Sequence, residues 1–575
     1  MARKDVHYEV FLKKHKKASW ALVEAIEDRQ EALDLAHRLK SRHPKGSVRV
    51  KREQWIPEEN AFRGGTIFEA GAERFSEPEE KTGEASLPCL TPDDLSGAAA
   101  RETMRRVLSG WLERKQVAPL ELLHRADLIE ELDGSDTDLQ QAVQKVAIAR
   151  AQGSDASVHA YMRLINDLVE KGVAQAGREA KAAKKPPKAR GFAELSEKIL
   201  AEGSPEKRLR RAIAERLSEA KDFGAKTGML LDFHDDLPSD PQAREFAARE
   251  TDTFIAEMLS FDGAVRSVLG RTEDLGEEVE RLTAVYEGSA DGPDLSHAPQ
   301  EARRLAEKFA QKSLPSAHME VAKRILDALR APKRFRPSSV MREIELARKL
   351  AQRLIVASGP NLHPESLVDA FTHRSAKLLA PEAVDEALST AQDIAEQIER
   401  LYRMEDNLVG EQNKAKLAGY IRAKLKSQAA DSYFVRGAGG ALERLAQLTA
   451  LQKRALKGSF SPQDKTELAD AFDQVGMAVL DETKVLTRLT ETGKPALDQS
   501  RALLKLAVGG VLPTGRCVQD AQARAMRILS GDMARSAAGL PENRAVVGEI
   551  QTLITALRPK PPEPDGEPEA TQAAG

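Results

Sequence analysis

The densest group of potentially reactive side chains occupies residues 230–236, Leu-Leu-Asp-Phe-His-Asp-Asp. His234, Asp235 and Asp236 are residue types that bind divalent cations and transfer protons, so they are candidate metal ligands of a phosphohydrolase. Three consecutive side chains cannot all point the same way, and such a site would need further ligands from other helices. The alternative is a helix end followed by a polar turn before Pro238. We expect that alternative, with Asp232 near the last turn of the helix.

Two glycine-containing segments carry parts of nucleotide-binding patterns. Residues 510–517 have the glycine spacing of a phosphate-binding loop, but Arg516 and Cys517 stand where Lys and Ser or Thr are required. Residues 437–442 begin like a dinucleotide fingerprint and end in Leu442 where the third glycine belongs. Both segments are interpreted as turns between helices.

Other catalytic patterns are missing from the sequence. It contains no Gly-x-Ser-x-Gly, His-Glu-x-x-His or Cys-x-x-Cys motif. Its two cysteines, Cys89 and Cys517, are far apart and fit no metal-ligand spacing. We therefore expect no cofactor, no catalytic residues and two reduced thiols.

Basic residues near the N-terminus suggest a second kind of site. The first 75 residues hold 16 basic and 12 acidic side chains, which leaves a mild net charge of +4. A basic sheet face beside an aromatic ring can bind single-stranded nucleic acid through phosphate pairing and stacking. The candidates are Lys13, Lys14, Arg49, Lys51, Arg52 and Trp55. A solvated face is the alternative, and we expect no nucleic-acid partner.

These N-terminal candidates are positioned by a small α+β module over residues 1–75. Tyr8, Val10 and Leu12 alternate with polar residues as in a half-buried strand, and a second apolar run ends at Ile26. Asp28 and Glu31 form a capping-box pattern that predicts a helix. Two more short strands, around residues 48–50 and 66–69, complete a predicted ββαββ order.

Beyond this module, prolines at helix starts predict a mainly α chain. Proline suits the first helical turn, where its missing N–H has no partner to lose. Thr91, Ser204, Asp240 and Ser461 precede four of these prolines as expected N-caps. The fold class is therefore mainly α, an extended multi-helical array or bundles after the N-terminal module. The prolines are Pro92, Pro119, Pro205, Pro241, Pro364, Pro381, Pro462 and Pro541.

Changes in composition predict where this chain divides. The expected segments are the α+β module at 1–75, an acidic linker at 76–94, a helical domain at 95–176, a basic linker at 177–191, a helical domain at 192–329, a basic linker at 330–338, a helical domain with long hairpins at 339–557 and a disordered tail at 558–575.

Two apolar stripes predict long helices packed side by side. One follows Val384, Leu388, Ala391, Ala395, Ile398 and Leu401, and the other runs from Leu468 to Leu489. They favour intramolecular hairpins, and the alternative is the seam of a homodimer.

Bulk composition restricts the class of protein. Charged residues make up 31 % of the 575 residues, with a net charge of −3, and 4 % are aromatic. Balanced charge and aliphatic cores are typical of solvated helices and create no overall attraction to nucleic acid or membrane. No apolar stretch is long enough to span a bilayer. We expect a cytoplasmic, non-catalytic helical scaffold or regulator that binds a protein partner. The alternatives are the hydrolase around His234 and nucleic-acid binding by the N-terminal module.

Overall fold

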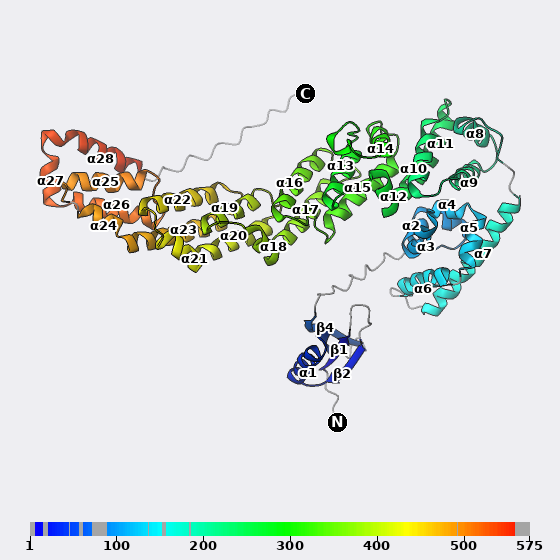
Figure 1. Ribbon diagram of the computed structural model, residues 1–575, viewed down its shortest axis with the longest axis horizontal. Helices are drawn as coiled ribbons and strands as arrows, with labels where there is room; N and C mark the ends of the chain where they lie inside the picture. The colour runs from blue at the N-terminus through cyan, green and yellow to red at the C-terminus, as the bar shows by residue number, and fades with distance from the viewer. Residues whose placement is uncertain are drawn as a thin grey trace. The chain divides into compact units, whose positions relative to one another are not determined.

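The computed structural model describes residues 6–14, 21–44, 46–56, 61–71, 89–135, 137–151, 157–182, 186–491 and 493–557 (Figure 1). The chain forms two compact units, one of residues 1–88 with 144–165 and the other of residues 89–143 with 166–575. The expected linker up to residue 88 and the expected tail at 558–575 lie outside the described residues. Helices hold 72 % of the chain, which confirms the mainly α prediction.

The first unit contains the predicted ββαββ module. Strands β1 (Val6–Lys13), β2 (Ala21–Ile26), β3 (Ser47–Ile56) and β4 (Ala61–Ala70) form an antiparallel sheet in the order β2-β1-β3-β4. Helix α1 (Arg29–Arg42) packs on one face, where Ala32 and Ala36 meet Val10 and Val50 in a small core. The Asp28 carboxylate accepts the Glu31 N–H at 2.9 Å, as the capping pattern predicts. In the described part of the chain the strands end at Ala70, which confirms their expected confinement to the N-terminus.

A first hydrophobic cluster in the second unit extends from Leu108 to Phe371. Phe254, Ile255 and Met258 on one helix and Ile325 and Leu329 on another are among its fully buried members. The helices of this region are η1 (Pro92–Ser96), α2 (Ala98–Val107), α3 (Ser109–Lys115), α4 (Pro119–Leu123), α5 (Ala126–Asp133), α6 (Thr137–Ala151), α7 (Val158–Ala182), α8 (Phe192–Leu200), α9 (Pro205–Leu217), α10 (Phe223–Asp235), α11 (Pro241–Leu259), α12 (Asp262–Leu269), α13 (Leu275–Tyr286), η2 (Pro293–Leu295), α14 (Gln300–Ala310), α15 (Pro315–Arg330), α16 (Val340–Val356) and α17 (Pro364–Leu378).

A second hydrophobic cluster extends from Val340 to Ile550. Helix α16 belongs to both clusters, because Ile344 joins the second cluster and Leu350 joins the first. The remaining helices are α18 (Pro381–Leu388), α19 (Ile394–Glu405), α20 (Glu411–Leu425), α21 (Gln428–Ala430), η3 (Asp431–Val435), α22 (Ala441–Lys457), α23 (Pro462–Thr483), α24 (Val485–Thr490), α25 (Ala496–Val508), α26 (Arg516–Leu529), α27 (Asp532–Ala538), η4 (Pro541–Asn543) and α28 (Arg544–Ala556). No helix in the described ranges is long and apolar enough to cross a bilayer.

All eight prolines named from the sequence occupy the first turn of a helix, two of them in 3-10 turns. Asp240 and Ser461 cap their helices through side-chain oxygens, as expected. Ser204 does not cap α9: its φ of 54° places it in the left-handed region, where the hydroxyl makes no cap hydrogen bond. At Thr91 the carboxylate of Asp94 accepts the backbone N–H at 2.8 Å.

The two apolar stripes do not form single helices, and the expectation of one continuous helix in each is wrong. The first is divided between α18 and α19, because the Asp393 carboxylate accepts the Glu396 N–H and starts a new helix. The second is divided at Lys484, whose φ of 50° ends α23 before α24 begins. The paired helices α22 and α23 do pack on each other as a hairpin.

The expected basic linkers are more ordered than their composition indicates. Helix α7 continues to Ala182, six residues into the stretch expected to be a linker from residue 177. The first hydrophobic cluster has members on both sides of 177–191 and of 330–338. Within 330–338, Phe335 is fully buried.

Candidate functional site

The three candidate metal ligands at the end of α10 point to three different helices. His234 is buried, and its Nδ1 lies 3.0 Å from the Thr251 hydroxyl on α11. Asp235 pairs with Arg304 and Lys308 on α14 at 2.6 and 2.5 Å. The Asp236 carboxylate accepts the Phe192 N–H at 2.6 Å and so caps α8.

The electrostatics of these residues are consistent with structural roles. Burial, followed by the nearby charge of Lys308, lowers the pKa of His234 to about 4. Burial of Asp235 opposes its ionisation, but hydrogen bonds from Lys308 and Arg304 hold its pKa below the usual range. Asp232 lies in the last turn of α10 and pairs with Arg304 at 2.8 Å. Across the described ranges, no three His, Cys, Asp or Glu side chains converge as a metal site would require.

The nucleic-acid candidates occupy the N-terminal sheet without forming a continuous basic face. Arg49 is 5 % exposed and pairs with Glu69 on β4 at 3.4 Å. The Lys51 ammonium lies 5.9 Å from the centre of the Phe11 ring. In the strand register Glu9 lies opposite Lys51 and Glu69 opposite Arg49, so two of these basic residues face an acidic residue on the neighbouring strand. Lys13 ends β1, Lys14 follows it, and Arg52 lies opposite Tyr8. The side chain of Trp55 lies outside the described residues.

The loop that resembles a phosphate-binding motif holds an internal carboxylate at its helix start. Asp473 of α23 accepts the backbone N–H groups of Arg516 and Cys517 at 2.8 and 2.9 Å. These are the first N–H groups of α26, the positions that a phosphate would use. Burial, together with Asp473, raises the pKa of the Cys517 thiol. The loop is a turn between α25 and α26, as the sequence indicates.

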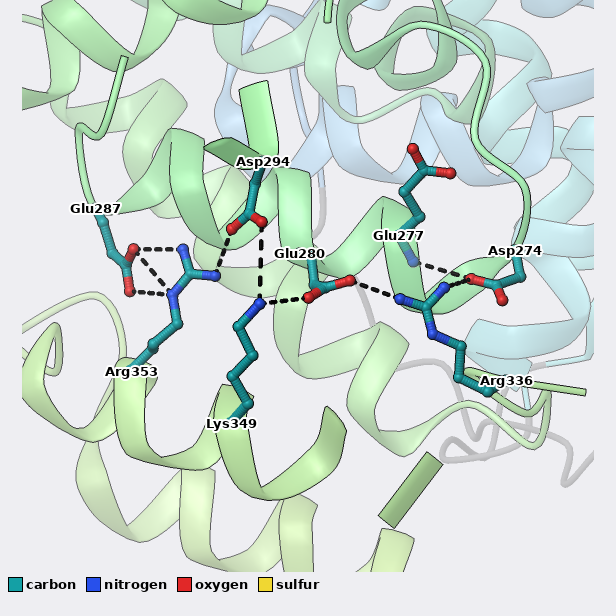
Figure 2. Close-up of polar contacts among 8 residues, drawn as sticks. All are labelled: Asp274, Glu277, Glu280, Glu287, Asp294, Arg336, Lys349 and Arg353. Carbon is teal, nitrogen blue, oxygen red and sulfur yellow. Dashed lines mark hydrogen bonds and ion pairs between the residues drawn. The ribbon is translucent and has the colours of Figure 1, made fainter. Parts of the chain in front are cut away.

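A chain of ion pairs joins α13 to α16, and sequence patterns alone do not predict it (Figure 2). Arg353 makes a bidentate contact with Glu287, with a shortest distance of 2.6 Å, and a second contact with Asp294 at 2.6 Å. Lys349 contacts Glu280 at 2.7 Å. Arg336 reaches the other oxygen of Glu280 at 2.7 Å and also Asp274 at 2.6 Å. We call Asp274, Glu280, Glu287, Asp294, Arg336, Lys349 and Arg353 the ion-pair ladder.

The ladder holds the C-terminal half of α16 through Lys349 and Arg353 and the segment before the helix through Arg336. Apart from Lys349, its side chains are only 14–25 % exposed, so solvent and salt screen these contacts less than surface pairs. The four-residue spacing of Lys349 and Arg353 puts both on one helix face and is a signal that the sequence does contain. Their acidic partners lie some 60–70 residues earlier, and no local pattern predicts that pairing.

The connection between α15 and α16 is held by a buried arginine. Arg374 of α17, 2 % exposed, donates to the backbone carbonyls of Ala328, Leu329 and Lys333 at 2.7–3.0 Å. Its guanidinium lies 3.7 Å from the centre of the Phe335 ring and pairs with the buried Glu343 at 3.2 Å. Arg374 thus satisfies the carbonyls at the C-terminal end of α15.

Exposed apolar side chains occur where α15 and α17 begin and α16 ends. Met319, Ile355, Val356 and Val368 are 56, 47, 86 and 52 % exposed. The loop after α16 is fixed by a pair of backbone hydrogen bonds between Gly359 and Leu362 and by the contact of Asn361 with His318 at 3.0 Å. We call the four side chains the apolar set. It is the candidate functional site.

The ladder and the apolar set are linked through the last turn of α16. Arg353 is held by Glu287 and Asp294, and Ile355 and Val356 follow it by two and three residues. Each helical residue rotates the side-chain direction by about 100°, so Ile355 points roughly away from the ladder. Val356, at three residues, points within about 60° of the direction of Arg353, so of the two exposed side chains only Ile355 lies on the side opposite the ladder.

Comparison of this chain with models of protein families, with curated proteins and with solved structures gives no match.

Proposed function

We propose that this protein is a non-catalytic helical scaffold or regulator that binds a protein partner through the apolar set. The observation that supports this proposal is the exposure of Val356, 86 %, and Ile355, 47 %, on a helix end held by Arg353. Large exposed aliphatic side chains commonly mark interaction sites, and Ile355 and Val356 are adjacent in the chain. Because their backbone is already fixed, binding loses little conformational entropy.

A stable complex needs more contact than four side chains can supply. Specific interfaces bury about 1,200–2,000 Å² in total, with an apolar centre and a polar rim. The rim is available on the same helices, where Arg330 and Asp369 are 43 and 71 % exposed. We therefore expect a partner with an apolar patch or an amphipathic helix, surrounded by charge of both signs.

The test compares partner capture by the full chain and by Val356→Asp in extracts of the native cell. A matched control is Met533→Asp. Met533 is 84 % exposed, much like Val356, but it lies on α27 and not on the helices that carry the apolar set. Val356→Asp should lose the partner that wild type and Met533→Asp both retain. Equal capture by all three proteins would contradict the proposal.

Sedimentation of the purified proteins separates a second copy of this chain from a different partner. If the partner is a second copy, the wild type should sediment as a dimer and Val356→Asp as a monomer. If the partner is another protein, both should sediment as the same species without extract.

A further inference from the structure

A cavity of about 660 Å³ lies in the second unit among α5, the end of α7, α8 and α9. Its apolar wall includes Leu123, Ile199 and Ala212. Lys207, Arg208 and Arg211 line it from α9, where a four-residue spacing brings side chains to one face. This volume falls within the range of pockets that hold small molecules.

A buried imidazole nitrogen at one end of the cavity has no partner within the described part of the chain. His124, which caps the end of α4, lines the cavity, and its Nε2 is buried without a hydrogen bond. Buried polar atoms of this kind are uncommon in folded proteins and costly unless something pairs with them. The ring of His124 therefore lines the cavity while its Nε2 lies just beneath the surface, so the ring must turn for this nitrogen to pair with a bound molecule.

The cavity lining holds three cations and three carboxylates, and the charges that act most strongly on the imidazole are positive. Burial, then Arg210, Lys207, Arg101 and Arg211, lower the pKa of His124 to about 3, so the ring is neutral within a positive field. The carboxylates that line the cavity, Glu179, Glu202 and Glu215, are 50, 36 and 40 % exposed, and water screens them. Arg208 and Arg211, 24 and 31 % exposed, are less accessible than their acidic partners.

The cations also connect the walls of the cavity. Lys207 pairs with Glu179 near the end of α7 at 3.4 Å and with Asp93 at 2.9 Å. Arg211 donates to the Glu179 backbone carbonyl at 3.2 Å. The contact with Glu179 is the longer of the two contacts of Lys207, so it is the one that an incoming anion would replace.

We propose that this cavity binds a small organic anion, with its carboxylate or phosphate group against His124, Lys207 and Arg211 and its apolar body against Leu123, Ile199 and Ala212. A turn of the neutral His124 ring brings its Nε2–H to the anion and gives this buried nitrogen its partner. This binding site is separate from the apolar set and independent of the partner that the set binds.

The experiment records the histidine side-chain resonances of the full chain by NMR. The His124 resonances are assigned as those that disappear in His124→Asn. Inorganic phosphate and acetate are titrated separately, and calorimetry gives the affinities. At least one anion should shift the His124 resonances saturably. Response to phosphate alone identifies a phosphate ester as the ligand class, and response to acetate identifies a carboxylate.

Two variants and a control test the position of the site. Lys207→Gln with Arg211→Gln should weaken binding by about tenfold or more, since two charged hydrogen bonds are lost. Ala176→Phe should abolish binding by filling the cavity while keeping every charge. Lys198→Gln, on α8 outside the lining, should bind as wild type. The proposal is overturned if neither anion moves the His124 resonances, or if Ala176→Phe binds as wild type does.

Discussion

At the residue scale, the sequence makes His234 a candidate metal ligand, whereas the structure shows a buried, neutral imidazole ring. The sequence correctly indicates a helix end at Asp232–Asp236. It cannot indicate that Asp236 caps α8, whose first residue lies 44 positions earlier, because such a contact depends on how distant helices pack. The sequence shows which residue types could react. A site also requires that their side chains meet at one point, and that depends on the tertiary structure.

The neutral state of His234 predicts a pH dependence of stability. An unfolded histidine takes up a proton near pH 6.5, but folded His234 does so only near pH 4. The unfolded state therefore binds more protons in this window, and the free energy of unfolding should fall as pH falls, by up to about 1.4 kcal/mol per pH unit.

The measurement is urea unfolding of wild type and His234→Asn between pH 6.5 and 4. The variant keeps a polar group near Thr251 but lacks the titrating ring. The difference in free energy of unfolding between wild type and variant should therefore shrink as pH falls. A deficit that stays constant across the window would contradict this assignment.

Arg374 predicts a large effect of one conservative-looking substitution. Arg374→Met should lower the free energy of unfolding by about 3–5 kcal/mol, because it leaves three carbonyls without a donor and removes one of the two guanidinium groups that pair with the buried Glu343, the other being that of Arg334. Arg330→Met is the control: Arg330 on α15 also pairs with α17, but it is 43 % exposed and should cost under about 1 kcal/mol. Chemical denaturation measures both, and similar costs would show that Arg374 is not a structural anchor.

At the element scale, helix starts could be predicted and helix interruptions could not. Proline has a local preference for the first turn, and all eight sites follow it. Lys484 has no such preference for the left-handed conformation that it adopts, with φ of 50°. Lys484 is the residue at which α23 ends and α24 begins. The same limit applies to the candidate site. The sequence shows that the apolar set consists of apolar residues, but it does not show that their side chains are exposed.

The ion-pair ladder predicts a measurable coupling between α13 and α16. A double-mutant cycle of Arg353→Met and Glu287→Gln should give a coupling energy of about 1–2 kcal/mol, because the pair is bidentate and 22 and 17 % exposed. The pair of Lys171 and Asp167, 62 and 58 % exposed on one helix, should give about 0.3–0.5 kcal/mol in the same measurement. Equal coupling energies in the two cycles would mean that the ladder does not fix α16.

At the scale of the whole molecule, α16 connects the two hydrophobic clusters of the second unit. The sequence places a boundary just before it, on the evidence of basic residues and prolines at 330–338. Composition does not show that Phe335 is buried. Nor does it show that Ile344, in the first half of α16, belongs to one cluster while Leu350, further along the helix, belongs to the other. A destabilising substitution in α16 should therefore increase local unfolding in both clusters.

Hydrogen exchange of Leu350→Ala tests this coupling. Leu350 is fully buried in the first cluster, and its truncation to Ala should lower the free energy of unfolding by about 2–5 kcal/mol. Exchange should then accelerate in α18 and α19 of the second cluster as well as in α17. Leu305→Ala on α14, equally a member of the first cluster, should leave α18 and α19 unchanged. Acceleration restricted to the first cluster in both variants would show two independent folding units.

The distance along the chain between Arg374 and the carbonyls that it satisfies has a consequence for biosynthesis. Arg374 follows Leu329 by 45 residues, so α15 leaves the ribosome well before the group that completes its C-terminal end. At 5–20 residues per second, synthesis of that interval takes about 2–9 s. During those seconds the nascent chain presents the unpaired end of α15 and the ring of Phe335 to chaperones and proteases, and the arrival of α17 closes that period.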